Sequence, residues 1–389
     1  MGEAKFLPPK QNAVLTRLIQ SIFYIVMYFA YQIKLEVSDR DIATLKKLDG
    51  KRVIYLPNHS NLDDGLVMFL FSARLGQLFH YIVAYEAFNG IIGWLMQSVG
   101  AYSIRRGVGD RSSILQTLKI LQQPKCKLTI FPEGGCSYQN DTVMQFRTGA
   151  IELAFKAVSK LAKQEADSDL YLVPVSIQYF YLGKTDRQID RSLSELETAL
   201  SISPAKNDFY LRLRAIAARV LDNLEAEYQI DSNLGEDWNF RIARLKKTLL
   251  NYCEDKLNLA SATQLPNRER VYRVQSMLED SSQLNPDLSE GDHQHLKLTT
   301  VRLLNFDAIY DGYVAEKPTS ERFLATIDRL EREVFQIDRP KSKGLRKARI
   351  KIGTPINARQ YLSDLHGDSQ KIIQELTQTI QHQVQANLS

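Results

Sequence analysis

The feature that most limits the fold of this chain is an alternation of short β-rich runs and amphipathic segments between residues 52 and 181. The β-rich runs consist mainly of β-branched, aromatic and leucine residues, and two of them end at a proline. The segments between them repeat apolar residues at helical spacing. Strands that alternate with helices predict an α/β fold with a mostly parallel sheet flanked by helices. Strands are expected at 52–56, 81–84, 102–104, 128–131 and 171–181, and helices at 91–99, after Asp110 and at 149–164.

A different pattern follows, because residues 186–343 have heptad-like apolar spacing, many charges and almost no strand signal. We predict that this region is a long helical insertion before the last strand. Residues 348–352 are expected to form that strand, and residues 371–384 a closing helix. The expected segments are 1–40 (N-terminal and membrane-associating), 41–185 (core), 186–343 (insertion) and 344–389 (closing strand and C-terminal helix).

The N-terminal segment contains a strongly apolar run, residues 18–33, with three tyrosines and with basic residues on either side. Tyrosines and flanking cations are typical of a helix at the lipid headgroup boundary. A spanning helix needs about 20 apolar residues, and Gln20 and Ser21 interrupt this shorter run. We favour an N-terminal membrane-associating helix that is interfacial or re-entrant, with a single span and a buried helix as alternatives.

Composition excludes several classes of function. The formal net charge is only +5, and no zinc-finger spacing or long basic run is present, so nucleic-acid binding is not expected. Three widely spaced cysteines predict reduced thiols in a cytosol-facing compartment. The pair His293 and His295 lacks neighbouring ligands at metal-binding spacing. We therefore expect a solvated loop there and no metal site.

The first candidate for chemistry is a histidine–aspartate pair in the loop after the strand at 52–56, where Asn58-His59 is followed by Asp64. In such a loop the carboxylate can reach one imidazole nitrogen and fix the tautomer. The other nitrogen can then take a proton from a hydroxyl group. Taken alone, the pattern also fits a loop histidine beside helix-capping aspartates.

Two further motifs present groups suited to an anionic ligand. The strand motif Gly100–Arg106 ends in two arginines, whose guanidinium groups can grip a phosphate. The motif at 131–135, Phe-Pro-Glu-Gly-Gly, follows a buried strand, and its glycines permit close backbone approach to a ligand. Arg147 precedes the next helix and could add an anion contact. Each of these motifs alone also fits an ordinary strand end or turn.

Together and in this order, the motifs resemble those of the glycerolipid acyltransferase superfamily, of the lysophosphatidic acid acyltransferase type. The family pattern is Asn-His-x4-Asp, then Gly-x-x-Phe-x-x-Arg, then Phe-Pro-Glu-Gly, then a Val-Pro-Val strand. The corresponding segments here are 58–64, 100–106, 131–134 and 173–175, and residues 348–356 resemble the family's closing strand. The resemblance covers under half of the chain.

The resemblance implies transfer of a fatty acyl group from an acyl thioester to the hydroxyl of a lysophospholipid such as 1-acylglycerol-3-phosphate. It implies that His59 is the base, that Asp64 rather than Asp63 orients it, and that Arg106 binds the acceptor phosphate. No covalent enzyme intermediate is required. The further substrate-binding residues expected are Asn58, Glu133, Gly134, Gly135 and Arg147.

The resemblance also implies the partners and the location. The expected partners are a membrane lipid and acyl-CoA or acyl carrier protein as co-substrate, with no other cofactor and a place at the cytoplasmic face of a membrane. Ser103 replaces the usual aromatic residue, and Gly135-Cys136 replaces a common Thr/Ser-Arg/Lys pair. These departures leave open a non-glycerol lipid acceptor, such as an amino-lipid or a carotenoid hydroxyl. A non-catalytic lipid-binding scaffold is the alternative from another class.

Overall fold

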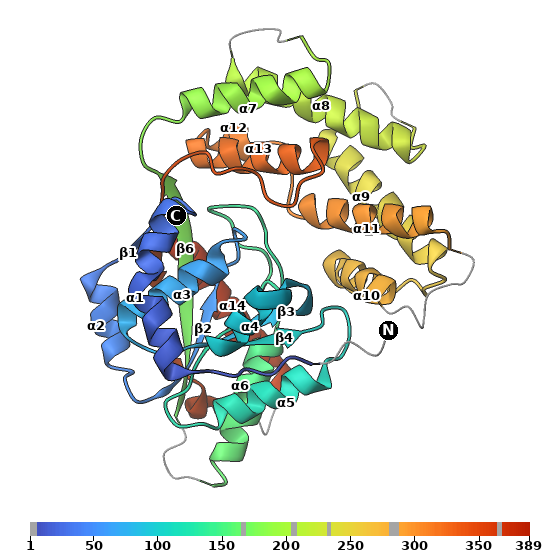
Figure 1. Ribbon diagram of the computed structural model, residues 1–389. Coiled ribbons are helices and arrows are strands. Elements are labelled where there is room, and N and C mark those ends of the chain that lie inside the picture. Colours follow the sequence, from blue (N-terminus) through green and yellow to red (C-terminus); the bar gives the residue numbers. More distant parts are fainter. Residues whose placement is uncertain (1–5, 165–168, 204–207, 232–234, 280–287, 364–367) are drawn as a thin grey trace. The chain divides into compact units, whose positions relative to one another are not determined.

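The computed structural model describes residues 6–164, 169–203, 208–231, 235–279, 288–363 and 368–389, which form two compact units (Figure 1). We call residues 6–105, 110–180 and 345–389 the sheet unit. The helical unit comprises residues 106–109 and 181–344.

The sheet unit contains a mixed, mostly parallel sheet. Its strands are β1 (Ile33–Val37), β2 (Arg52–Pro57), β3 (His80–Ala84), β4 (Ala101–Ile104), β5 (Lys127–Thr129), β6 (Leu170–Tyr181), β7 (Arg346–Ile352) and β8 (Ile356–Asn357). Among the described residues their order is β1-β7-β6-β2-β5-β3-β4, and β8 pairs with β6. Strand β2 runs parallel to β5 and β6, and β3 runs parallel to β4 and β5, whereas β8 is antiparallel to β6. The predicted α/β fold with a mostly parallel sheet is therefore confirmed.

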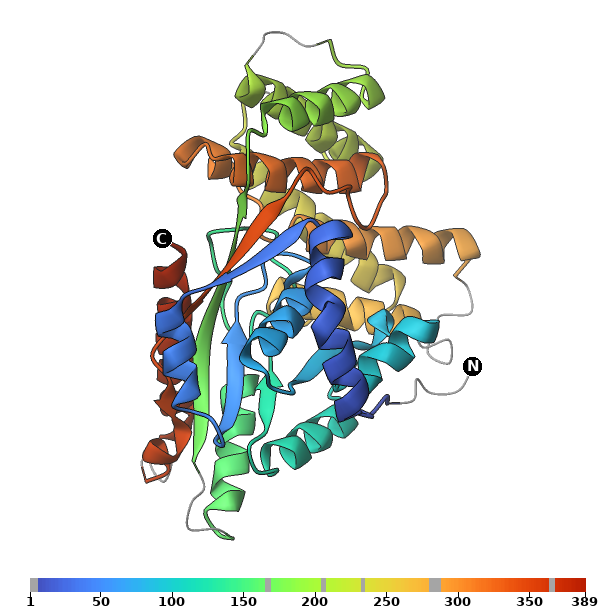
Figure 2. The same cartoon turned by 60° about the vertical axis from the view of Figure 1, so that its left-hand side comes forward.

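Helices cover both faces of this sheet (Figure 2). They are α1 (Ala13–Phe29), α2 (Asp39–Lys46), α3 (Asp64–Leu75), α4 (Gly90–Ser98), α5 (Arg111–Leu121), α6 (Gly149–Leu161) and α14 (Ser369–Leu388). Asp110 caps α5 by accepting a hydrogen bond from the backbone N–H of Ser113, as the sequence predicts.

The alternation of side chains in β2 explains the two layers. Val53 and Tyr55 point into a core that includes residues of α1, α3 and α4, whereas Ile54 and Leu56 point into a core with α5, α6 and α14. Because successive side chains of a strand face opposite sides, a strand that is buried on both faces is apolar at every position. Residues 53–56 of the predicted run have this composition, and all of β2 is buried, including Arg52 at its start.

The helical unit confirms the predicted helical insertion before the last strands. Its helices are α7 (Asp186–Ala199), α8 (Phe209–Glu227), α9 (Trp238–Lys256), α10 (Asn267–Glu279), α11 (Glu290–Asn305), α12 (Tyr313–Glu316) and α13 (Ser320–Val334). Leucines and other apolar residues of these helices form a separate core, which includes Leu193, Leu196, Ile216 and Val220 from the heptad-like pattern. The helical unit therefore has its own packed interior.

The N-terminal apolar run divides between two elements. Helix α1 begins after the N-cap Asn12 and ends at Phe29, while Ile33 at the end of the run belongs to β1. Strand β1 pairs with β7, which lies more than 300 residues later in the chain. The apolar run alone does not predict this strand, because its hydrogen-bonding partner is so distant. Among the described residues, no helix combines the length and the apolar character needed to cross a membrane.

Two sequence predictions need correction. His293 and His295 lie in α11 and not in a loop, because Ser289 and Asp292 form a capping box that starts the helix before them. The strand expected at 128–131 spans Lys127–Thr129. It ends earlier because the backbone turns at Phe131, whose carbonyl accepts a hydrogen bond from Gly134 N–H.

Candidate functional site

The centre of the candidate site is a hydrogen-bonded pair, His59 in the loop that follows β2 and Asp64 at the start of α3. The imidazole Nδ1 lies 2.9 Å from Asp64 Oδ2. The same oxygen accepts a 2.8 Å hydrogen bond from the backbone N–H of Asn61, which fixes the carboxylate within its own loop. The Asp64 side chain is fully buried, whereas the imidazole is 21% exposed. With Nδ1 bound to the carboxylate, Nε2 is the ring atom available to a substrate.

Tyr179 holds the other oxygen of the same carboxylate. Its buried phenol donates a 2.6 Å hydrogen bond to Asp64 Oδ1 from the end of β6. Burial, followed by the negative charges of Asp64 and Asp63, raises the pKa of Tyr179 well above its ordinary value. The phenol therefore stays protonated and remains a donor. Nothing in the sequence analysis identified Tyr179, although it shares one face of β6 with Val175 and Ile177.

The neighbouring Asp63 has a different partner. Its Oδ2 lies 2.9 Å from Nη2 of Arg346, at the start of β7, and both side chains are largely buried. The Arg346 guanidinium also lies 5.3 Å from the centre of the Tyr179 ring. Asp63 thus pairs with Arg346, whereas Asp64 contacts His59. The orienting role of Asp64 stays a prediction.

Glu133 joins the loop after β5 to the histidine loop. Its carboxylate is buried, and Oε1 accepts a 2.6 Å hydrogen bond from the backbone N–H of His59. Oε2 accepts a 3.1 Å bond from Met144 N–H. A second link runs from Ser137 N–H to the carbonyl of His59 at 2.7 Å. These contacts fix the backbone of His59 on both sides, so Glu133 has a positioning role beside the substrate contact expected of it.

The glycines after Glu133 bring Arg147 close to the same loop. Gly134 has a φ of +73°, and a Cβ at this position would meet the guanidinium of Arg147. The backbone N–H of Arg147 donates to the carbonyl of Pro132 at 2.9 Å. The buried Gly135 follows in the same turn. The predicted residues Glu133, Gly134, Gly135 and Arg147 are therefore brought together with His59.

Asn58 anchors the histidine loop to β6. Its side-chain amide donates to the carbonyl of Ile177 at 3.0 Å and accepts from Ile177 N–H at 2.7 Å. The residue is buried, and both polar atoms of its side chain bond to the backbone. Where β2 ends, the Asn58 side chain thus makes the two hydrogen bonds to β6 that a neighbouring strand's backbone would otherwise make. A direct contact between Asn58 and the substrate stays a prediction.

Arg106 belongs to the helical unit, where it packs on Tyr272 of α10. The guanidinium lies 4.4 Å from the centre of the Tyr272 ring, and Nη1 donates to the phenol oxygen at 3.1 Å. Gly107 follows with a φ of +77°, and a Cβ there would collide with the backbone of Tyr272. Tyr272 of the insertion therefore orients Arg106, the residue predicted to bind a phosphate. The sequence analysis did not foresee this contact.

Ser103, one of the departures from the family pattern, has a packing role. Its Oγ accepts a 2.9 Å hydrogen bond from Leu7 N–H, and its own N–H donates to the carbonyl of Leu7 at 3.0 Å. The segment before α1 thus lies along β4, and the buried serine completes this contact.

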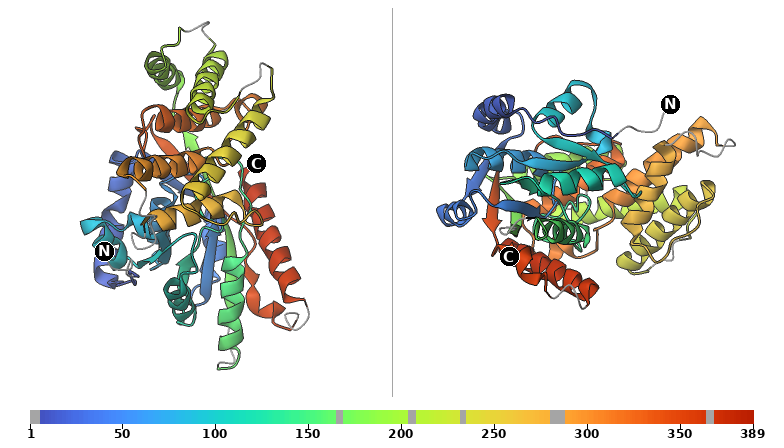
Figure 3. Two further views of the ribbon diagram at one scale, coloured as in Figure 1. Left: turned by 90° about the vertical axis from the view of Figure 1, so that its right-hand side faces the viewer. Right: turned by 90° about the horizontal axis from the view of Figure 1, so that it is seen from below.

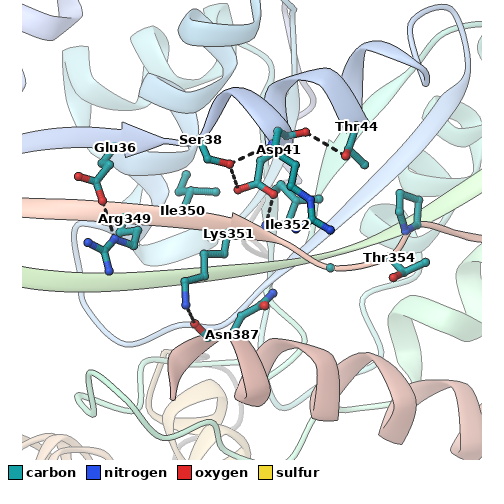
Figure 4. A pocket seen from close by; sticks show the side chains of 13 residues that line it. Glu36, Ser38, Asp41, Thr44, Arg349, Ile350, Lys351, Ile352, Thr354 and Asn387 are labelled. Carbon is teal, nitrogen blue, oxygen red and sulfur yellow. Dashed lines mark hydrogen bonds and ion pairs between the residues drawn. The ribbon is translucent and has the colours of Figure 1, made fainter.

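A pocket of about 730 Å³ lies elsewhere in the sheet unit, between α2, β7 and the end of α14 (Figure 4). Figure 4 shows that its polar groups bond to one another. Glu36 Oε1 accepts from Arg349 Nε at 2.5 Å, and Lys351 Nζ donates to the carbonyl of Asn387 at 2.7 Å. None of the predicted site residues is among its described lining residues.

The fold and the site define an α/β domain that holds a histidine–aspartate pair in the loop after a central parallel strand. Residues 34–178 match the family described as Acyltransferase. The match extends from β1 nearly to the end of β6 and covers less than half of the 389 residues. A comparison with curated proteins gives no match. The family match supports an acyltransferase function for this chain.

Proposed function

We propose that the protein is an O-acyltransferase that moves a fatty acyl group from an acyl thioester to the hydroxyl of a lysophospholipid such as 1-acylglycerol-3-phosphate. The observation that carries the proposal is the His59–Asp64 pair, with Nδ1 and Oδ2 2.9 Å apart in a segment that matches the Acyltransferase family. A base of this kind serves a substrate with a hydroxyl group to deprotonate.

The proposed reaction is a direct transfer. His59 Nε2 takes the proton of the acceptor hydroxyl as its oxygen attacks the thioester carbonyl. The new C–O bond forms, the C–S bond breaks, and the imidazolium returns its proton to the leaving thiolate. The Asp64 carboxylate stabilises the imidazolium during the transfer, and no protein nucleophile takes part. Backbone amides of the turn at 133–135 are candidates for stabilising the oxyanion.

Recognition of the acceptor is proposed to depend on cations. Arg106, stacked on Tyr272, and Arg147, packed against Gly134, are the residues that would bind the phosphate. The donor is acyl-CoA or acyl carrier protein, and the acceptor is drawn from a membrane, with the protein at its cytoplasmic face. The exposed apolar side chains of α1 support membrane association.

The test is transfer of a labelled acyl group from a thioester to lysophosphatidic acid by the purified protein. His59→Ala should lower kcat by about 10²- to 10⁴-fold, the usual contribution of a general base. His382→Ala, on the exposed surface of α14, is the matched control and should keep full activity. Equal turnover by the wild type and His59→Ala would remove His59 from the mechanism. Products from a panel that includes non-glycerol lipid hydroxyls identify the acceptor.

A further inference from the structure

Helix α1 exposes a continuous apolar stripe. Val14, Leu18, Ile22, Ile25 and Phe29 are 81%, 61%, 51%, 61% and 76% exposed. At 100° per residue these five side chains fall within roughly 80° of the helix circumference. The buried residues of α1 lie on the opposite side. The stripe is therefore an outward face and not the edge of a packed core.

Helix α4 exposes a second apolar group. Ile91, Ile92 and Trp94 are 82%, 64% and 56% exposed, and Leu95 is 37% exposed. Exposed positions of a short helix are normally polar. Packing within the sheet unit therefore does not explain why these four positions of α4 are apolar. More than half of the large apolar side chains exposed among the described residues lie on α1 and α4.

The two helices are joined directly. The backbone N–H of Asn12, the N-cap of α1, donates to the carbonyl of Ser98 at 2.9 Å, and Thr16 Oγ1 donates to the same carbonyl at 3.2 Å. Lys10 N–H donates to the carbonyl of Gln97 at 2.9 Å. The right-hand panel of Figure 3, which is the view from below, shows α1 in dark blue and α4 in cyan on the same side of the sheet. The two exposed groups therefore belong to one surface of the sheet unit.

The chemistry of this surface selects a lipid bilayer as its occupant. Neither helix contains an acidic residue, and the nearest carboxylates along the described chain are Glu36 and Glu86. The exposed cations Lys10 and Lys34 flank α1, and exposed Arg17 lies in its first turns. Lys34 Nζ lies 6.0 Å from the centre of the Tyr28 ring. An apolar centre with tyrosine, tryptophan and cations around it matches the acyl chains, interface and anionic headgroups of a membrane.

We propose that α1 and α4 form one membrane-docking face, in which Ile91, Ile92 and Trp94 insert beside the apolar stripe of α1 into an anionic bilayer. This inference rests on the proposed function, since a lipid acceptor must be drawn from a membrane. Two anchoring points hold the sheet unit in one orientation, whereas one helix alone leaves it free to rotate about the helix axis.

The experiment uses the full chain with vesicles of phosphatidylcholine and phosphatidylglycerol. Trp238→Phe leaves Trp94 as the one tryptophan, because the chain has two. The Trp94 emission should shift to shorter wavelength on vesicle binding and should be quenched by lipids brominated on their acyl chains. Unchanged Trp94 emission in the presence of bound vesicles would overturn the role of α4.

Variants test the same face by co-sedimentation. Ile91→Ser with Ile92→Ser should weaken vesicle partitioning by at least roughly tenfold, because two exposed side chains lose their burial in lipid. Phe240→Ser is the matched control, since Phe240 is 58% exposed on α9. Equal loss with Phe240→Ser contradicts the proposal. Loss of self-association and not of vesicle binding would assign the face to a second copy of the chain, which also contradicts it.

Activity measured without vesicles separates the two proposals. Acyl transfer to a short-chain, water-soluble lysophospholipid by the double variant, together with lost vesicle binding, supports both. Acyl transfer by a wild-type protein that does not bind vesicles overturns the docking face alone. Vesicle binding that depends on α4, without turnover on any acceptor, overturns the proposed function alone.

Discussion

The phenol of Tyr179 and the carboxylate of Asp64 are joined by a 2.6 Å hydrogen bond that links β6 to the histidine loop. The carboxylate is thus shared between His59 at one oxygen and Tyr179 at the other. Because Asp64 is fully buried, each of these bonds is made away from water and contributes to the orientation of the imidazole. The carboxylate that orients His59 is therefore itself fixed by a residue 115 positions later in the chain.

Tyr179→Phe removes this hydrogen bond and keeps the aromatic ring in the core. Loss of a bond to a charged group costs about 1.5–3 kcal/mol, so kcat should fall by roughly tenfold or more. The carboxylate, no longer shared, attracts the imidazolium more strongly, so the acid limb of the kcat/KM profile should move to higher pH. Rate–pH profiles of both proteins check this. A profile identical to wild type would show that Tyr179 only fills the core.

Glu133→Gln tests the tether on the His59 backbone. An amide keeps one acceptor oxygen but turns its NH2 group toward a second backbone N–H, which leaves that buried donor unsatisfied. We expect a loss of about 1–3 kcal/mol in the free energy of unfolding, with lower turnover. Denaturant titration and the acyl-transfer assay measure the two effects. Glu375→Gln, at an exposed position of α14, is the control and should change neither quantity. If Glu133→Gln lost activity but kept its full stability, a direct contact between Glu133 and the substrate would be favoured instead.

Tyr272→Phe tests whether the insertion orients Arg106. The stacked ring remains, but the phenol oxygen 3.1 Å from Nη1 is removed. A hydrogen bond to a charged group is worth about 1.5–3 kcal/mol. Because only part of this energy orients Arg106 toward a phosphate, KM for a phosphate-bearing acceptor should rise several-fold with little change in kcat. Arg106→Gln should raise this KM further. Acceptor titrations measure both, and an unchanged KM in Arg106→Gln would rule out phosphate binding by this residue.

Lys127 predicts a pH dependence of stability. Burial lowers the pKa of its amine from 10.5 to about 8, while the amine donates to the carbonyls of Leu48 and Lys51. Between about pH 8 and 10.5 the unfolded chain holds more protons, so the free energy of unfolding should rise with pH over this interval. Lys127→Met should abolish the rise. Denaturant titrations at several pH values measure it, and parallel curves for both proteins would refute the assignment.

Local pattern identified much of this protein. The strands are recognisable because a run that is buried on both faces is mainly apolar, as residues 53–56 of β2 are. The helical insertion is recognisable because its apolar residues repeat at helical spacing. The His59–Asp64 contact was predictable because the two residues are only five positions apart, between the end of β2 and the start of α3. The acceptor, the acyl donor and the membrane location remain predictions.

Tertiary structure alone decided which residues contact the carboxylates beside His59 and, in the helical unit, which residue stacks on Arg106. Tyr179 and Arg346 reach Asp64 and Asp63 only because the order and register of β6 and β7 bring distant residues together. Tyr272 reaches Arg106 only because Gly107 allows α10 to approach that loop. Strand β1 exists because β7 supplies its hydrogen bonds. Sequence determines which segments become strands and helices through local periodicity, whereas partners far apart in the chain depend on packing that no single segment contains.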